Sequence, residues 1–178
     1  MKEILVQALG GRAFEYAVIP TSALNFVEAL YKSCEANLCG NYNRSWSCPP
    51  ASGTMEDQKR RICAYQNAFV FTTKFDLEDS FDFEGMEKAK NIHDDTTRSI
   101  HDVVGRTNPV YGAGGCGVCK PCAYPEPCRF PEKLYSSIES AGINVTDLSR
   151  AAGIRYNNGP NTVTYFSMVL FNSPAGGP

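Results

Sequence analysis

The stretch Thr162-Val-Thr-Tyr-Phe-Ser-Met-Val-Leu-Phe171 decides the fold, because its apolar side chains fall on both faces of an extended chain. A strand with one face in water would alternate apolar and polar residues instead. The pattern therefore predicts a strand in the interior of a sheet. A second strand is predicted at Ala68–Phe75, where three phenylalanines share one face.

Helical periodicity occupies much of the chain between these strands. The longest predicted helix runs near Glu84–Val104, where apolar residues recur at helical spacing. Four further helices are predicted. They run from Thr54 to about Tyr65, from Thr21 or Ser22 to Cys34, from Pro131 to Gly142, and over Asp147–Ala152.

The N-terminal residues predict a hairpin. Ile4–Leu9 and Ala13–Ile19 are apolar stretches joined by Gly10-Gly11-Arg12, and the glycines suit a tight turn. Because strands and helices are interleaved without regular βαβ alternation, we expect one α+β domain over residues 1–172, with a mostly antiparallel sheet covered by helices. Residues 173–178 are expected to form a flexible tail.

Composition excludes several classes of protein. The chain has 178 residues, 43% of them hydrophobic and 20% charged, which excludes a disordered chain or a fibrous repeat. The net charge of −2 indicates no nucleic-acid partner. Apolar runs fall well short of the roughly 18 residues that cross a bilayer, so no membrane association is expected. We see no export signal, and we expect a cytoplasmic protein.

Eight cysteines stand beside only two histidines. The strongest pattern is Cys116-x2-Cys119-x2-Cys122-x5-Cys128. Disulfides are one interpretation, but disulfide scaffolds rarely crowd thiols so closely, and a chain of this length can bury a core without them. We therefore favour metal or cluster binding. The chain has two cysteine-rich loops, and the Cys116–Cys128 pattern forms the second of them.

Four thiolates select zinc or an iron–sulfur cluster. Zinc sites usually use two C-x2-C pairs separated by a structured segment, whereas three cysteines at consecutive x2 spacing suit a 4Fe–4S cluster. A ferredoxin has its fourth cysteine after three residues, so the place of Cys128 in this site is an inference. Iron–sulfur binding is favoured, and structural zinc is the alternative.

The first cysteine loop has three thiols, in the pattern Cys34-x4-Cys39-x8-Cys48-Pro49-Pro50. Three thiolates could hold a second cluster with one open iron, a metal site with an open position, or a cluster completed by another residue. They could also be a zinc site or free buried thiols. Cys63 falls in a predicted helix, where a lone cysteine is more often a small buried hydrophobe.

The chain resembles a family of uncharacterised small prokaryotic proteins described as predicted metal-binding proteins, a domain of unknown function. The resemblance is carried by Cys34…Cys39…Tyr42…Trp46-Ser-Cys48-Pro-Pro, by Gly-Ala-Gly-Gly-Cys116…Cys119…Cys122…Pro-Cys128-Arg-Phe-Pro, and by Ser137-Ile-Glu-Ser-Ala-Gly-Ile-Asn-Val145. It implies seven candidate metal ligands: Cys34, Cys39, Cys48, Cys116, Cys119, Cys122 and Cys128. Cys63 lies outside the pattern.

Few other residues suggest chemistry. His93 and His101 lack the i, i+4 spacing of a helical metal pair and are expected on the surface, as is the Asp94-Asp95 pair. The function we expect is a cytoplasmic iron–sulfur protein with one or two clusters that exchanges electrons with a redox partner protein. The alternatives are a zinc-stabilised structural or partner-binding module, and an enzyme whose three-cysteine cluster has an open iron.

Overall fold

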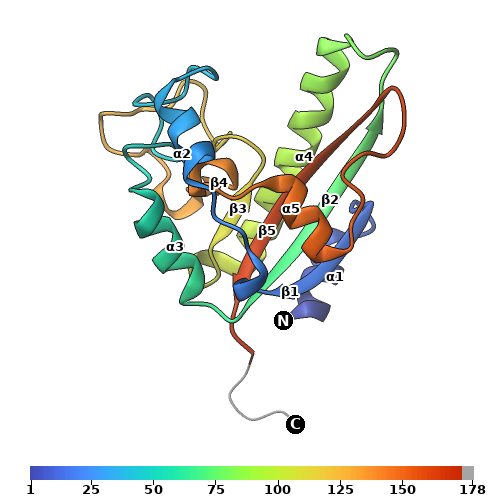
Figure 1. Cartoon of the computed structure of the whole chain (residues 1–178), viewed down its shortest axis with the longest axis horizontal. Helices are drawn as coiled ribbons and strands as arrows, with labels where there is room; N and C mark the ends of the chain where they lie inside the picture. Colours follow the sequence, from blue (N-terminus) through green and yellow to red (C-terminus); the bar gives the residue numbers. More distant parts are fainter. Residues whose placement is uncertain (174–178) are drawn as a thin grey trace.

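The computed structural model describes residues 1–173, and the predicted tail at 173–178 lies almost entirely outside them. A five-stranded sheet crosses the centre of the molecule, with helices on both faces (Figure 1). Its strands follow the spatial order β1 (Glu15–Pro20), β2 (Asn67–Asp76), β5 (Thr162–Phe171), β3 (Val110–Gly112) and β4 (Ser136–Ser137). All neighbours pair antiparallel except β3 and β4, which are parallel.

The sequence expectation of an interior strand at Thr162–Phe171 is confirmed, because β5 pairs with β2 on one edge and with β3 on the other. Alternate residues of the central strands supply two cores. Phe166, Met168 and Leu170 of β5 face one core, and Val169 and Phe171 face the other. A strand between two helical layers must be apolar on both faces, which explains the unbroken apolar run.

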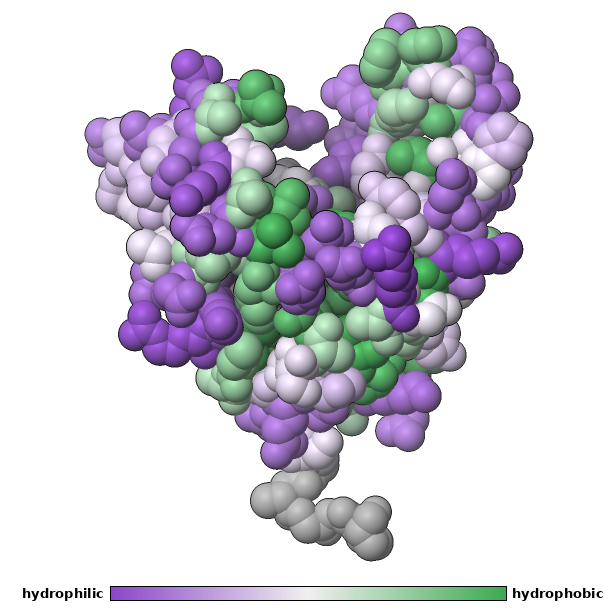
Figure 2. All heavy atoms as spheres, in the orientation of Figure 1, coloured by the Kyte–Doolittle hydropathy of each residue, from purple (hydrophilic) through white to green (hydrophobic). Residues whose placement is uncertain are grey.

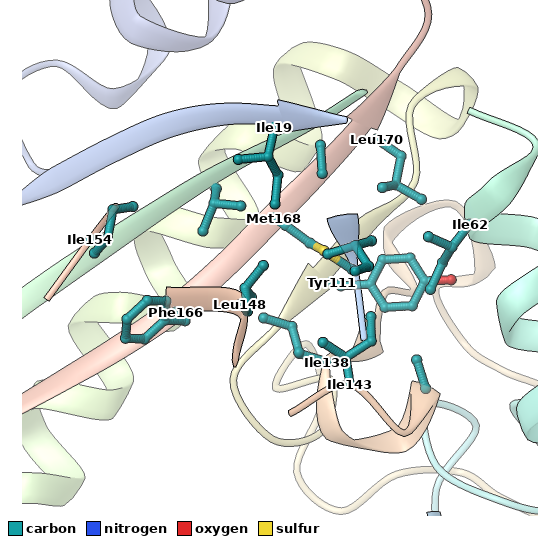
Figure 3. Close-up of a cluster of buried hydrophobic side chains, with 14 residues drawn as sticks. Ile19, Ile62, Tyr111, Ile138, Ile143, Leu148, Ile154, Phe166, Met168 and Leu170 are labelled. Atoms are coloured by element: carbon teal, nitrogen blue, oxygen red, sulfur yellow. The ribbon is translucent and has the colours of Figure 1, made fainter. Parts of the chain in front are cut away.

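Residues 1–173 contain five α-helices, four of which supply buried residues to the cores on the two faces of the sheet. The five helices are α1 (Lys2–Leu9), α2 (Glu28–Glu35), α3 (Met55–Cys63), α4 (Phe83–Val104) and α5 (Val145–Ala152). Helices α3 and α5 pack on one face through Ile62 and Leu148, and Figure 3 shows that core. Helices α1 and α4 pack on the other face. The α+β class is therefore confirmed, as are the helices predicted near 54–65, 84–104 and 147–152. Within residues 1–173, no helix combines the length and apolarity needed to cross a membrane.

Three predicted elements are wrong. The first strand of the expected N-terminal hairpin is the helix α1, in which Leu5 and Leu9 lie one turn apart and are both buried against the sheet. Gly10 ends this helix with a φ of 55°, a left-handed conformation that glycine adopts without strain. A short apolar run fits a strand or a helix equally well, and packing decides between them.

The helix predicted from Thr21 to Cys34 is interrupted. Phe26 forms an isolated antiparallel bridge with Ile143, and the amide of Val27 donates to the carbonyl of Gly142. Residues Thr21–Ala23 form only a 3-10 turn, and α2 begins at Glu28. A backbone that pairs with a distant segment cannot close its own helical turns at the same residues.

The helix predicted between Pro131 and Gly142 is also absent. Pro131–Lys133 and Glu139–Ala141 are 3-10 turns, and Ser136–Ser137 form strand β4. The amide of Ile138 donates to the carbonyl of Gly112, which extends the pairing with β3. Long-range pairing thus overrides the local helical signal.

Helix α4 meets the sheet through polar as well as apolar side chains, which corrects the expected surface positions of His93 and His101. His93 is fully buried and His101 is 5% exposed. The imidazole of His93 lies 2.8 Å from the Thr73 hydroxyl of β2 and 2.8 Å from the Ser167 hydroxyl of β5. The sequence of α4 alone does not reveal these partners, because both belong to the sheet.

Candidate metal centre

Two cysteine segments that are far apart in the sequence pack against each other. The Ser47 hydroxyl accepts a 2.9 Å hydrogen bond from the amide of Cys116 and lies 2.8 Å from the Ser45 hydroxyl. The Trp46 indole donates to the carbonyl of Glu126 at 2.9 Å. We call the combined segments, residues 34–50 and 113–130, the cysteine lobe. It lies beside α2 and faces α4 across the top of the molecule (Figure 1).

Gly115 permits this close packing. A Cβ atom added at Gly115 would lie 3.1 Å from the Ser47 Oγ and 3.6 Å from the Cys48 Sγ. Cys48 therefore lies directly beside the glycine-rich turn that leads into the second cysteine loop. The Trp46 ring meets Tyr124 edge to face at 5.1 Å, so this tryptophan packs within the lobe.

The first group of thiols is Cys34, Cys39 and Cys48. Cys34 lies in the last turn of α2 and is half-buried, Cys39 is exposed, and Cys48 is 8% exposed. Burial raises the pKa of the Cys34 thiol, and negative charge on Cys39 and Cys48 raises it further. The structure thus places these three thiols within electrostatic range of one another. Cys34 is not fully buried, as is true of every residue of α2.

Glu139 accompanies this first group, and the sequence analysis did not identify it. Its carboxylate accepts a 3.1 Å hydrogen bond from the amide of Gly114. It also lines a cavity of about 520 Å³ together with Cys34 and Cys39. Its charge contributes to the raised pKa values of Cys34 and Cys48. The available signal was its position inside the stretch from Ser137 to Val145 that carries the family resemblance.

The second group contains Cys116, Cys119, Cys122 and Cys128, all half-buried. Burial raises the pKa of the Cys116 thiol, and the charges of Cys119 and Cys128 add to this effect. Cys122 differs from the others. Burial raises its pKa, but hydrogen bonds from the amides of Tyr124 and Trp46 and from Ser45 outweigh burial, so its pKa falls below the ordinary value. Hydrogen bonds that favour the thiolate also favour metal ligation.

These donors match a soft metal in chemistry, since seven thiols lie in one lobe. Within residues 1–173, no group of three or more cysteine, histidine, aspartate or glutamate side chains is arranged so that it could hold a metal ion. The thiols lie near one another but do not converge on a common metal position, so the two proposed sets of ligands stay predictions. Metal sites commonly become ordered only when the metal binds.

All eight cysteines lie in the described part of the chain, and all are free thiols. Cys63 is exposed at the end of α3, so the expectation that it is a small buried hydrophobe is wrong. The helix turns Ile62 toward the core and leaves the adjacent cysteine outside. The position of Cys63 keeps it out of the cysteine lobe.

Helix α4 packs against the loop that carries the second cysteine group. The side chain of Asp94 is 8% exposed and both of its oxygens lie 2.6 Å from the Lys90 Nζ, so the expectation that Asp94 lies on a wet face is wrong. A Cβ atom at Gly117 would lie 3.2 Å from the Asp94 carboxylate and 3.2 Å from the Arg98 guanidinium. The loop can approach these charges because residue 117 is glycine.

The fold is an α+β domain, and the site brings two groups of thiols into one lobe. Together they define the class of protein as a candidate thiolate metal-binding protein. The chain belongs to the family described as "Predicted metal-binding protein (DUF2284)", whose model matches residues 17–171. The resemblance found in the cysteine motifs is thereby confirmed. No curated protein matches the chain. No solved structure matches it either.

Replacing Ser47 with alanine should destabilise the protein by about 0.5–1.5 kcal/mol, because the half-buried amide of Cys116 loses its acceptor. Urea unfolding of the metal-free protein measures this free energy. Ser33→Ala is the matched control, since the Ser33 hydroxyl is exposed and donates only within α2. Equal unfolding free energies for Ser47→Ala and wild type would contradict the role of Ser47 in joining the two segments.

Proposed function

We propose that this protein is an iron–sulfur protein that exchanges single electrons with a redox partner protein. Cys116, Cys119, Cys122 and Cys128 would hold a 4Fe–4S cluster, which supplies a reversible one-electron couple when bound. The observation that carries the proposal is the packing of two thiol groups into one lobe around Ser47. That packing gives a soft-donor environment larger than one zinc ion needs.

The first group would hold a second cluster with three thiolates. Glu139 is our candidate for its remaining ligand, because it shares a cavity with Cys34 and Cys39. The exposure of Cys39 at the surface would leave this centre close to a docked redox partner. The open position of a three-thiolate centre also favours oxygen sensitivity, since an iron without a protein thiolate is accessible.

A purely structural zinc site has less support. The fully buried residues of the two core clusters all lie outside the cysteine lobe, and of the lobe only Cys116 and Val118 pack against one of these clusters as half-buried neighbours. The domain therefore has a hydrophobic core that does not need a metal to close it. A small module stapled by zinc would instead build its core around the ligands.

Metal and sulfide analysis of anaerobically purified protein tests this proposal. We expect about four irons and four sulfides for each cluster, a brown colour, and bleaching with appearance of a paramagnetic signal when dithionite donates an electron. Cys48→Ser should lose the iron of one cluster and keep the other. A colourless protein that binds stoichiometric zinc, rejects iron and sulfide, and has no reducible absorption would refute the proposal and favour the zinc module.

A further inference from the structure

A cleft lies between the N-terminal half of α4 and the cysteine lobe. Figure 2 shows this hollow between the cysteine lobe and α4, with hydrophilic side chains along it. Its volume is about 620 Å³, within the size range of small-molecule sites. Cys116, Cys119 and Cys122 lie along one wall, and α4 forms the opposite wall.

The cations of this cleft are not all neutralised. Lys90 is paired with Asp94, which removes both from consideration as free charges. Lys120 donates to the neutral amide of Asn91 at 3.3 Å; its charge acts on Asp94, but it forms no close ion pair with an acidic side chain among the described residues. Arg44 is exposed, and its guanidinium makes no hydrogen bond or ion pair within the part of the chain that the structure describes. Two cations on the lobe wall are thus available to a ligand.

We propose that this cleft binds a small anionic molecule bearing a carboxylate or a phosphate, held by Arg44 and Lys120 beside the second cysteine group. A guanidinium matches the planar carboxylate and the phosphate oxygens with paired N–H donors. The Asn91 amide offers a further polar contact on the α4 wall. Tyr165 completes the cleft; its hydroxyl donates to the carbonyl of Met86, which keeps the ring against α4.

The negative charge of Glu87 should weaken anion binding, so replacing Glu87 gives a second test with the opposite expected change in affinity. It is exposed on the α4 wall of the same cleft. A carboxylate here repels an incoming anion, so Glu87→Gln should strengthen binding. Neither Glu87 nor Arg44 is a candidate metal ligand, so replacing either residue tests anion binding without removing a ligand of the metal centre.

Equilibrium dialysis of the full chain with radiolabelled inorganic phosphate or succinate, at fixed ionic strength, measures this binding. We expect saturable binding of at least one anion, and the tighter of the two identifies phosphate or carboxylate as the recognised group. Arg44→Gln should raise the Kd about tenfold or more, the usual effect of losing a charge-assisted hydrogen bond. Glu87→Gln should lower the Kd.

Arg60→Gln is the matched control, because Arg60 is an exposed arginine on α3 whose ion pair with Asp57 lies away from the cleft. It should leave the Kd within about twofold of wild type, on the scale of an exposed ion pair. Absence of saturable binding of both anions, or equal effects of Arg44→Gln and Arg60→Gln, would overturn the proposal. Iron and sulfide content measured on the same samples reports separately on the metal centre.

Discussion

Replacing Cys119 with serine should remove the metal of the second cysteine group and lower the melting temperature by about 6–12 °C. A metal that binds only the folded state stabilises it by mass action, by about 3 kcal/mol when the metal is at a hundred times its Kd. Cys119 is only half-buried, so its replacement by serine leaves the hydrophobic core unchanged. Calorimetry together with metal analysis measures both effects.

Two controls separate loss of metal from damage to the fold. Cys63→Ser should keep the metal and the melting temperature of wild type, because Cys63 lies on α3 outside the cysteine lobe. Metal-free wild type should melt close to metal-free Cys119→Ser. A Cys119→Ser protein with full metal occupancy and an unchanged melting temperature would show that Cys119 is not a ligand.

Acidification should destabilise the folded protein through His93. Burial, with a smaller contribution from the charge of Lys90, lowers the pKa of His93 from 6.5 to about 3. Below about pH 6.5 the unfolded chain therefore takes up a proton that the folded chain excludes. This contribution to stability is complete at neutral pH, falls as the pH drops toward about 3, and amounts to a loss of about 2–3 kcal/mol by about pH 4.5.

The comparison of two variants isolates this effect from the carboxylates that titrate over the same range. His93→Gln should unfold with a shallower pH dependence, by about one proton, while being less stable at neutral pH. Ser167→Ala removes a hydrogen-bond partner but keeps the buried imidazole, so it should lose stability and keep the wild-type slope. An imidazole of His93 that titrates near pH 6.5 in NMR spectra of the folded protein would contradict the prediction.

The parts of the fold that depend on local pattern were predictable. The unbroken apolar run of β5 indicated a strand between two layers, and the Thr54 cap indicated the start of α3, where the structure has a capping box with Asp57. The long periodic segment of α4 was also correct. In each case the signal lies within one element and does not require knowledge of a distant partner.

The parts that depend on contacts between distant segments could not be predicted. The bridge of Phe26 with Ile143 shortened a predicted helix, and the pairing of Ser136–Ser137 with β3 replaced another. His93 and Asp94 have a polar appearance in the sequence, yet both are buried. Their burial becomes favourable only because Thr73, Ser167 and Lys90 satisfy their polar atoms.

The same division holds for the candidate metal centre. The sequence by itself predicted which residues are candidate soft-metal ligands, because cysteine spacing is a local property, and it determined the family through the same motifs. Only the tertiary structure decided that the two loops form one lobe through Ser47 and Gly115, that Glu139 lies beside the first thiol group, and that a cleft of about 620 Å³ opens beside the second. The physical reason is that hydrogen bonding, burial and charge pairing act between atoms that are close in space, and the linear order of residues does not encode that closeness in any local pattern.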